Sequence, residues 1–348
     1  MTQDARQLNL AFVGFGHVGR AFSRLLLRRR SWLRKELGVE CRVTGIASLD
    51  HGIAIDPAGI PLQNVLRSWK PGSSLVRFHN GPTCASIPDF VRQCGADVLL
   101  EMSVLSLTGE PAAGYMREAL GAGLHVVTVN KGPVATQFRR LTRLARLRAV
   151  RFLYEGTVMD GAPVFNLVRQ TLPATRILSL RGILNSTTNY ILSQMEQGAP
   201  FASALAYTQD QGIAEADPSL DLDGWDAAMK LSILIQALMG GTTRPDEIRR
   251  EGISEETGKL VRAAVRRDRR IRLVARAYRH AGQVTGKVEP EELEMFDPLA
   301  SIRGLSNILI LNTDTMGELA IIENNPSVQQ TAFALFADLV TLLLRPQR

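Results

Sequence analysis

The chain has 348 residues, of which 45% are hydrophobic and 22% charged, with a net charge of +7. This length and balance predict a globular protein of two domains, and no apolar run reaches the ~18 residues that a membrane helix requires. The amino-terminal stretch leads directly into a strand-like run, so we expect no signal peptide, and the three cysteines (Cys41, Cys84 and Cys94) lack metal or disulfide spacing, which favours reduced thiols in a cytoplasmic protein.

The first part of the chain predicts strands that alternate with helices. Short apolar runs typical of buried strands occupy residues 8–14, 41–48, 96–103, 124–130 and 150–158. Helical periodicity begins at about residue 17 and returns over residues 110–123 and 136–149. Such alternation predicts a parallel sheet with helices on both faces.

The later part has a different pattern. A strand, a polar turn and a helix are predicted over 175–198, helices over 200–212 and 224–241, two strands within 301–322, and a final amphipathic helix over 331–344. We therefore predict an α/β fold with a nucleotide-binding domain over 1–135 and an α+β domain over 136–310. Residues 311–348 would form a carboxy-terminal segment that returns to the first domain.

The positive charge comes from three arginine-rich stretches at 25–36, 139–151 and 265–279. Apolar residues alternate with the arginines at helical spacing, which favours solvated helix faces, and no nucleic-acid-binding signature accompanies them. We therefore expect a small-molecule substrate and neither a nucleic acid nor a membrane as partner. The chain has only six lysines, and Lys131 and Lys230 lie in the motifs described below.

A glycine-rich motif follows the first predicted strand and opens the first predicted helix. It consists of Gly14, Phe15, Gly16, His17, Val18 and Gly19. In this context the first glycine permits a tight turn, the second lets the backbone approach a pyrophosphate, and the third lets the helix pack on the strand. The motif therefore predicts binding of a nicotinamide dinucleotide.

The choice between NAD and NADP stays open. Asp50 is the nearest acidic residue after the second predicted strand, where a carboxylate binds the adenosine ribose and disfavours a 2′-phosphate. It lies farther from the glycines than is usual, and Arg67 and Lys70 could instead bind the phosphate of NADP. Ser103, at the end of the third predicted strand, is a further expected cofactor contact.

Asn130 and Lys131 directly follow a predicted buried strand. Ligands of open parallel sheets bind at the carboxyl ends of the strands. A lysine at that edge is either an ordinary surface residue or a group that stabilises negative charge on a substrate oxygen and transfers a proton. We interpret Lys131 as a catalytic residue and Asn130 as a cofactor contact.

Five small polar residues, 185–189, precede a predicted helix. Helix capping explains part of this cluster, and a pocket for a polar small molecule is the alternative. Asn185 and Thr187 are the expected substrate contacts.

An acidic stretch follows. It contains Glu215, Asp217, Asp221, Asp223 and Asp226, and it ends at Lys230. The spacing of a calcium-binding EF-hand is absent, and Asp217 and Asp223 fit a solvated loop. Asp226 and Lys230 are i,i+4 on an otherwise apolar helix, where an ion pair is costly unless it has a function.

These motifs, in this order, resemble those of homoserine dehydrogenases, over roughly residues 8–345 and in a short form without a kinase or regulatory domain. The carrying stretches are "GFGHVG", "VVTVNKGPVA", "YEGTV…GAPV", "RGILNSTTNYIL" and "GIAEADPSLDLDGWDAAMKLSIL". The resemblance implies a Rossmann domain and a catalytic and dimerisation domain. It also implies NAD(P)-dependent interconversion of L-homoserine and L-aspartate 4-semialdehyde in threonine and methionine biosynthesis, by a homodimer or homotetramer.

The resemblance also implies roles for single residues. Asp226 and Lys230 match the catalytic pair, Lys131 the lysine beside nicotinamide and substrate, Glu215 and Asp221 the substrate-binding carboxylates, and Gly212 a glycine near the cofactor. A site for a monovalent cation, Na⁺ or K⁺, would be lined by Glu155, Val158, Asp160 and Ala162.

The sequence departs from the family pattern in three places. Met159-Asp160-Gly161 replaces a glycine-rich turn, Ser186 replaces a glycine, and residues 323–332 lack the glycines of a GxGAG loop. The last departure keeps two alternatives open, namely a related oxidoreductase for another small amino or hydroxy acid, and a catalytically silent nicotinamide-binding regulatory protein.

Overall fold

The computed structural model describes residues 5–344, so the outer ends of the first and last predicted segments, 1–4 and 345–348, lie outside the described residues. The chain divides into two compact units. One consists of Met1–Gly161 together with Ser327–Arg348, and the other of Ala162–Pro326. None of the described helices is long and apolar enough to cross a membrane. The predicted α/β class with a Rossmann-like first part is confirmed.

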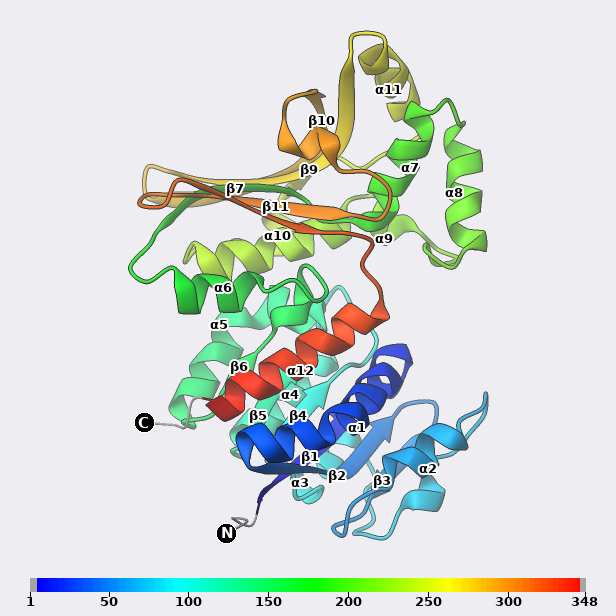
Figure 1. Cartoon of the computed structure of the whole chain (residues 1–348), viewed down its shortest axis with the longest axis vertical. Coiled ribbons are helices and arrows are strands. Elements are labelled where there is room, and N and C mark those ends of the chain that lie inside the picture. Colours follow the sequence, from blue (N-terminus) through cyan, green and yellow to red (C-terminus); the bar gives the residue numbers. More distant parts are fainter. Residues whose placement is uncertain (1–4, 345–348) are drawn as a thin grey trace. The chain divides into compact units, whose positions relative to one another are not determined.

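The first unit is built on a six-stranded sheet of order β3-β2-β1-β4-β5-β6 (Figure 1). All neighbours pair in parallel except β2 and β3, which form an antiparallel hairpin. The strands are β1 (Arg6–Val13), β2 (Val39–Ser48), β3 (Gly52–Ile55), β4 (Val98–Glu101), β5 (His125–Thr128) and β6 (Phe152–Leu153). Because β1, β4 and β5 run the same way, the loops that follow them emerge at one edge of the sheet.

Helices cover this sheet and include the last helix of the chain. They are α1 (His17–Leu37), α2 (Leu62–Arg67), α3 (Ile87–Gln93), α4 (Ala112–Gly121), α5 (Lys131–Leu147) and α12 (Val328–Leu344). Short 3₁₀ turns, η1 and η2, occupy Val76–Phe78 and Glu155–Thr157. Helix α12 packs beside α1 (Figure 1), and Leu335 and Leu339 join Phe12 and Phe22 in one apolar core. The predicted return of the carboxy-terminal helix is therefore confirmed.

The second unit contains a mixed sheet of order β12-β11-β7-β9-β10-β8. Its strands are β7 (Ile177–Ile183), β8 (Arg249–Arg250), β9 (Arg269–His280), β10 (Gln283–Glu294), β11 (Asn307–Thr313) and β12 (Glu318–Glu323). Only β8 and β10 pair in parallel. The two longest strands, β9 and β10, form a hairpin through Ala281 and Gly282, which both have positive φ.

The helices of this unit are α6 (Val164–Thr171), α7 (Ser186–Glu196), α8 (Phe201–Asp210), α9 (Ser219–Leu222), α10 (Trp225–Leu238) and α11 (Thr257–Val265), with 3₁₀ turns η3 (Pro245–Glu247) and η4 (Pro298–Ser301). Helix α10 lies along the sheet and contacts β9 and β10 (Figure 1). A Cβ atom at Gly286 of β10 would come within 2.9 Å of Ile235 and 3.1 Å of Leu231, so this glycine lets the helix approach the strand closely.

The structure corrects the interpretation of the third arginine-rich stretch. Most of residues 265–279 belong to β9 rather than to a solvated helix face. Arg272 is fully buried, where it forms an ion pair with Glu196 and donates to the carbonyl oxygens of Ile302 and Ala300. Alternating arginines and apolar residues fit either period over so short a window, and the pairing of β9 with β10 decides between them.

Two boundaries also differ from those expected. Helix α5 begins at Lys131 rather than near 136, because the side chain of Asn130 caps it by accepting from the backbone N–H of Gly132. The first compact unit continues past residue 135 to Gly161, because α5 packs on α4 and β6 pairs with β5.

Candidate active site

The glycine-rich turn connects β1 to α1 in the first unit. Gly14 has φ of +92°, and a Cβ there would lie 2.4 Å from the carbonyl oxygen of Met102, so only glycine fits. Gly16 is the N-cap of α1 and provides no side-chain cap, and a Cβ on it would meet no atom within 4 Å. Open space therefore adjoins the free N–H groups at the start of a helix. This is the setting that a dinucleotide pyrophosphate requires, and the residues present fit such a cofactor.

An aromatic cluster adjoins this turn and was missed in the sequence. The ring of Trp69 packs edge-on against Phe15 at 5.0 Å and against His51 at 4.5 Å between centroids. The guanidinium of Arg20 lies 5.3 Å from the centre of the Trp69 ring and donates to the carbonyl oxygen of Phe15. No local motif marks Trp69, because it reaches the glycine turn from more than 50 positions away in the sequence.

Asp50 is exposed in the turn between β2 and β3, at the carboxyl end of β2. The structure thus places a carboxylate after the second strand, where the ribose-binding acid of a Rossmann domain belongs. The two alternative cations, Arg67 and Lys70, lie at and just beyond the end of α2.

The loops that follow β4 and β5 hold the other predicted residues of this unit. Ser103 follows β4, and Asn130 and Lys131 follow β5, so parallel pairing of the two strands brings both loops to the same sheet edge. Asn130 is buried, and its amide donates to the carbonyl oxygen of Ser103 at 3.3 Å. Lys131 is half-buried in the first turn of α5.

The second unit contains the predicted acid–base pair. Asp226 and Lys230 are one turn apart on α10, and Nζ of Lys230 lies 3.1 Å from Oδ2 of Asp226. Nζ also donates to the carbonyl oxygen of Leu184 at 2.6 Å. The side chain of Asp226 is 7% exposed and that of Lys230 is 14% exposed, so this ion pair is not on a solvated face of the helix.

Asn185 joins this pair to a second carboxylate. Its side-chain N–H₂ donates to Oδ1 of Asp221 at 2.7 Å and to Oδ2 of Asp226 at 2.9 Å. Its side-chain oxygen caps α7 by accepting from the backbone N–H of Thr188 at 2.8 Å. Asn185 therefore caps α7, which is one of the two roles that the sequence left open, and it also contacts two carboxylates. We call Asn185, Asp221, Asp226 and Lys230 the polar cluster.

The residues that follow Asn185 differ in their contacts. Asn189 donates to the carbonyl oxygens of Gly304 and Ser306, just before β11, and Ser186 is hydrogen-bonded to Asn307, the first residue of β11. These side chains therefore connect α7 to the start of β11. Thr187 is buried, and its side chain has no recorded hydrogen bond to the residues that the structure describes.

Glu215 and Gly212 are exposed in the loop between α8 and α9. Glu215 contributes its main-chain carbonyl oxygen, rather than its carboxylate, to a hydrogen bond with the side chain of Gln209. The structure therefore brings Asp221 to the polar cluster and records no contact between Glu215 and that cluster. Asp223 is exposed, as expected, whereas Trp225 is half-buried beneath the guanidinium of Arg250, at 3.4 Å from the ring centre.

Three of the residues predicted to line a cation site belong to the end of the first unit. Glu155 and Val158 are buried, and the carboxylate of Asp160 accepts from Thr331 at 2.8 Å. Asp160 has φ of +34°, a turn conformation that the usual glycine would adopt more readily. Within residues 5–344 no group of three or more His, Cys, Asp or Glu side chains is placed to hold a metal ion.

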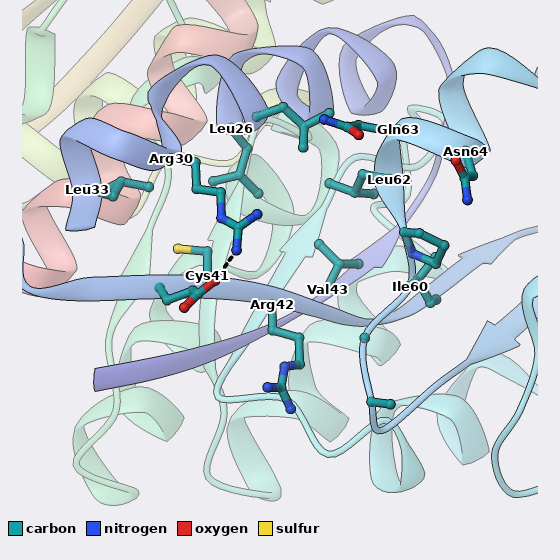
Figure 2. A pocket seen from close by; sticks show the side chains of 15 residues that line it. Leu26, Arg30, Leu33, Cys41, Arg42, Val43, Ile60, Leu62, Gln63 and Asn64 are labelled. Carbon is teal, nitrogen blue, oxygen red and sulfur yellow. Dashed lines mark hydrogen bonds and ion pairs between the residues drawn. The ribbon is translucent and has the colours of Figure 1, made fainter. Parts of the chain in front are cut away.

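A cavity of about 500 Å³ lies elsewhere on the first unit, between α1, the start of β2 and residues 58–64. Figure 2 shows Leu26, Leu33 and Val43 among its lining. Arg30, also in the lining, forms an ion pair with Glu40. The cavity adjoins the amino half of β2, whereas the glycine turn follows the carboxyl end of β1. Burial raises the pKa of the Cys41 thiol in its wall to about 12, which disfavours the thiolate form that a nucleophilic cysteine requires.

Comparison with known proteins agrees with this arrangement. The family model "Homoserine dehydrogenase" matches residues 163–340, and "Homoserine dehydrogenase, NAD binding domain" matches residues 14–155. The chain belongs to the homoserine dehydrogenase family. Homoserine dehydrogenases are NAD(P)-dependent oxidoreductases that act on a CH–OH group.

Individual members of the family match over nearly the whole chain. An NAD(+)-dependent homoserine dehydrogenase from Pseudomonas canavaninivorans is 34% identical, with 96% of each chain covered. A homoserine dehydrogenase from Methanocaldococcus jannaschii is 33% identical, covering 96% of this chain and 98% of the relative. A crystal structure of an Archaeoglobus fulgidus chain matches with a TM-score of 0.84 at 34% identity, covering 97% of this chain and 99% of that one.

Proposed function

We propose that the protein catalyses the reversible, NAD(P)-dependent interconversion of L-homoserine and L-aspartate 4-semialdehyde. The observation that carries the proposal is the polar cluster, in which a lysine whose side chain is 14% exposed, two aspartates and an asparagine are joined by short contacts. A nicotinamide cofactor, when bound, supplies or accepts the hydride. The residues of the chain then have to bind the substrate and move one proton at its hydroxyl oxygen.

Lys230 is the proposed proton donor to the alkoxide that develops when the aldehyde is reduced, and the acceptor in the other direction. Asp226 stabilises the ammonium form of Lys230 and orients its Nζ atom. Lys131 is proposed to stabilise negative charge on a substrate oxygen, because a half-buried lysine at the carboxyl end of a strand is suited to that role.

The substrate's ammonium group requires carboxylates. Asp221 and Glu215 are the proposed partners, and Asn185 fixes Asp221 from one side. Thr187 is proposed to donate to the substrate carboxylate.

A monovalent cation is proposed to bind the carbonyl oxygens of Val158, Asp160 and Ala162, beside Glu155. It would stabilise the turn formed by these residues. We propose a homodimer or homotetramer located in the cytoplasm.

NAD is proposed as the preferred cofactor. Asp50 follows β2 and is exposed, so its charge would repel the 2′-phosphate of NADP and accept from the ribose hydroxyls of NAD. One named relative is likewise NAD(+)-dependent. Asp50→Ser should reduce the preference for NAD over NADP, by lowering the kcat/KM for NAD and raising the kcat/KM for NADP.

The central experiment measures kcat/KM of the purified protein for homoserine with NAD and with NADP, against a panel of other small amino and hydroxy acids. Turnover of homoserine with a preference over the rest of the panel is the expected result. Preference for another acid would favour the alternative that the protein is a related oxidoreductase. The reason to test this alternative is that residues 323–332 lack glycine and contain Asn325 at φ +47°. Cofactor binding without turnover of any compound would overturn the enzymatic proposal.

A further inference from the structure

Glu101, the last residue of β4, is a fully buried carboxyl group that the proposed chemistry does not use. Burial raises the pKa of Glu101, while hydrogen bonds from Ser103, Thr128 and Asn130 oppose that shift. No lysine or arginine among residues 5–344 forms a recorded ion pair with it. A carboxyl group in such a place is costly, and a cost of this kind calls for an explanation.

The two carboxyl oxygens of Glu101 bind different loops. Oε1 accepts from both the backbone N–H and the hydroxyl of Ser103, in the loop that follows β4. Oε2 accepts from the hydroxyl of Thr128 at 3.0 Å, at the end of β5. One side chain therefore links the exits of two neighbouring strands at the edge of the sheet where cofactors of this fold bind.

The link continues through Asn130 to the start of α5. The backbone N–H of Asn130 donates to the hydroxyl oxygen of Thr128 at 3.0 Å, and its side-chain amide donates to the carbonyl oxygen of Ser103 at 3.3 Å. The oxygen of the same side chain accepts from Gly132 and so fixes the first turn of α5, which contains Lys131.

The same loops also contact the glycine turn. A Cβ atom at Gly14 would lie 2.7 Å from the backbone nitrogen of Ser103, so the loop after β4 packs directly on the loop after β1. A displacement of Ser103 would therefore change the position of the glycine turn as well as that of Lys131.

We propose that Glu101 is a positioning residue that fixes the loop after β4 against the loop after β5, and so holds Ser103, Asn130 and Lys131 in one register for the nicotinamide half of the cofactor. The inference rests on the proposed cofactor and lysine roles. Its mechanism is geometric, because misplacement of groups by as little as 1 Å can reduce turnover by about 100-fold.

The test compares Glu101→Ala with Glu101→Gln. Glutamine can still accept from Ser103 and can donate to the Thr128 hydroxyl, which has the main-chain carbonyl of Glu101 as a second acceptor at 3.0 Å. The alanine variant should weaken NADH binding, titrated without homoserine, and lower kcat about 10- to 100-fold. The glutamine variant should recover most of both.

Two further variants separate positioning from folding. Thr128→Val keeps the shape and removes one donor, so it should shift the NADH Kd and kcat in the same direction as Glu101→Ala even if that variant does not fold. Thr44→Val removes a buried hydroxyl from β2 of the same sheet and should lower only the melting temperature.

Wild-type Kd and kcat in folded Glu101→Ala or Thr128→Val, measured well below their melting temperatures, would overturn the inference in favour of a purely structural role. Because NADH binding is measured without substrate, the Kd part of this result is independent of whether homoserine proves to be turned over. A wild-type protein that binds NADH but leaves homoserine unchanged would contradict the proposed function, and the comparison of NADH Kd values between the Glu101 variants would remain valid.

Discussion

Nζ of Lys230 lies 3.1 Å from Oδ2 of Asp226, within a helix whose surrounding side chains are nearly all buried. Removing two charges from water is expensive, and the geometry here is completed by Leu184 and Asn185, which bond to the ammonium and the carboxylate. Leu184 and Asn185 both belong to the segment just before α7. The pair is therefore held in place by tertiary contacts as well as by helical spacing.

Lys230→Met should reduce kcat about 10²- to 10⁴-fold, the usual contribution of a positioned acid or base. Methionine retains most of the side-chain volume, so packing is affected less than chemistry. Lys259→Met is the matched control, because Lys259 is an exposed lysine on α11, in the same unit, whose partner Glu256 is also exposed. Steady-state kinetics on both variants give the comparison, and equal kcat values would exclude a proton-transfer role for Lys230.

Asn185→Ser should separate capping from organisation of the carboxylates. Serine is a good N-cap, so α7 should keep its stability, but its shorter side chain cannot reach Asp221 and Asp226 together. We expect kcat/KM for homoserine to fall more than about tenfold with a loss of stability below about 1 kcal/mol. Ser86→Ala, which removes the cap of α3, should show the reverse, lower stability with unchanged kinetics.

Gly14→Ala and Gly16→Ala should differ although both lie in one motif. At Gly14 the added methyl group meets the Met102 carbonyl and a positive φ, so the protein should be destabilised before any cofactor is considered. At Gly16 it meets nothing within 4 Å, so the melting temperature should stay near that of the wild type while NADH affinity falls by about tenfold or more. Unchanged NADH affinity in Gly16→Ala would place the pyrophosphate elsewhere.

Glu196→Ala should destabilise the second unit by about 3–5 kcal/mol, because it leaves the buried guanidinium of Arg272 without its carboxylate. Glu294→Ala removes one of the two carboxylate partners of Arg269 in a pair whose side chains are both at least 39% exposed, and should change the unfolding free energy by less than about 1 kcal/mol. Chemical denaturation of both variants measures the contrast. Equal losses would mean that burial does not determine the strength of these pairs.

Stability should decrease on acidification because of His125. Burial lowers the pKa of His125, Arg151 and Arg6 lower it further, and Asp97 opposes them. Its Nδ1 accepts from the backbone N–H of Arg151 at 3.0 Å, which the neutral ring can do. A base with a depressed folded pKa contributes stability at high pH, and that stability is lost as pH falls from about 6.5, the unfolded value, through the folded pKa.

His125→Asn tests this effect, because the amide oxygen can accept the same hydrogen bond without titrating. As the pH falls below about 6.5, the unfolding free energy of the wild type should decrease more steeply than that of the variant. Parallel pH profiles would exclude His125 as the source.

Much of the candidate site could be predicted locally. The glycine turn, the edge position of Lys131 and the i,i+4 spacing of Asp226 and Lys230 each depend on a few adjacent residues and on one helical or strand period. The position of Trp69 against Phe15 could not be predicted, and neither could the burial of Arg272. Both depend on contacts between residues far apart in the chain, for which a single sequence contains no periodic signal.

The sequence by itself determined the alternation of strands and helices in the first part of the chain, the glycine-rich turn and the residue types available for proton transfer, because hydrophobic period and glycine spacing are local properties. Only the tertiary structure decided which of these residues meet. It joined Asn185 to Asp221 and Asp226, recorded no contact between Glu215 and them, and placed the carboxyl of Glu101 between two loops. Strand pairing and helix packing fix such meetings, and they become defined only when distant segments bury their apolar faces together.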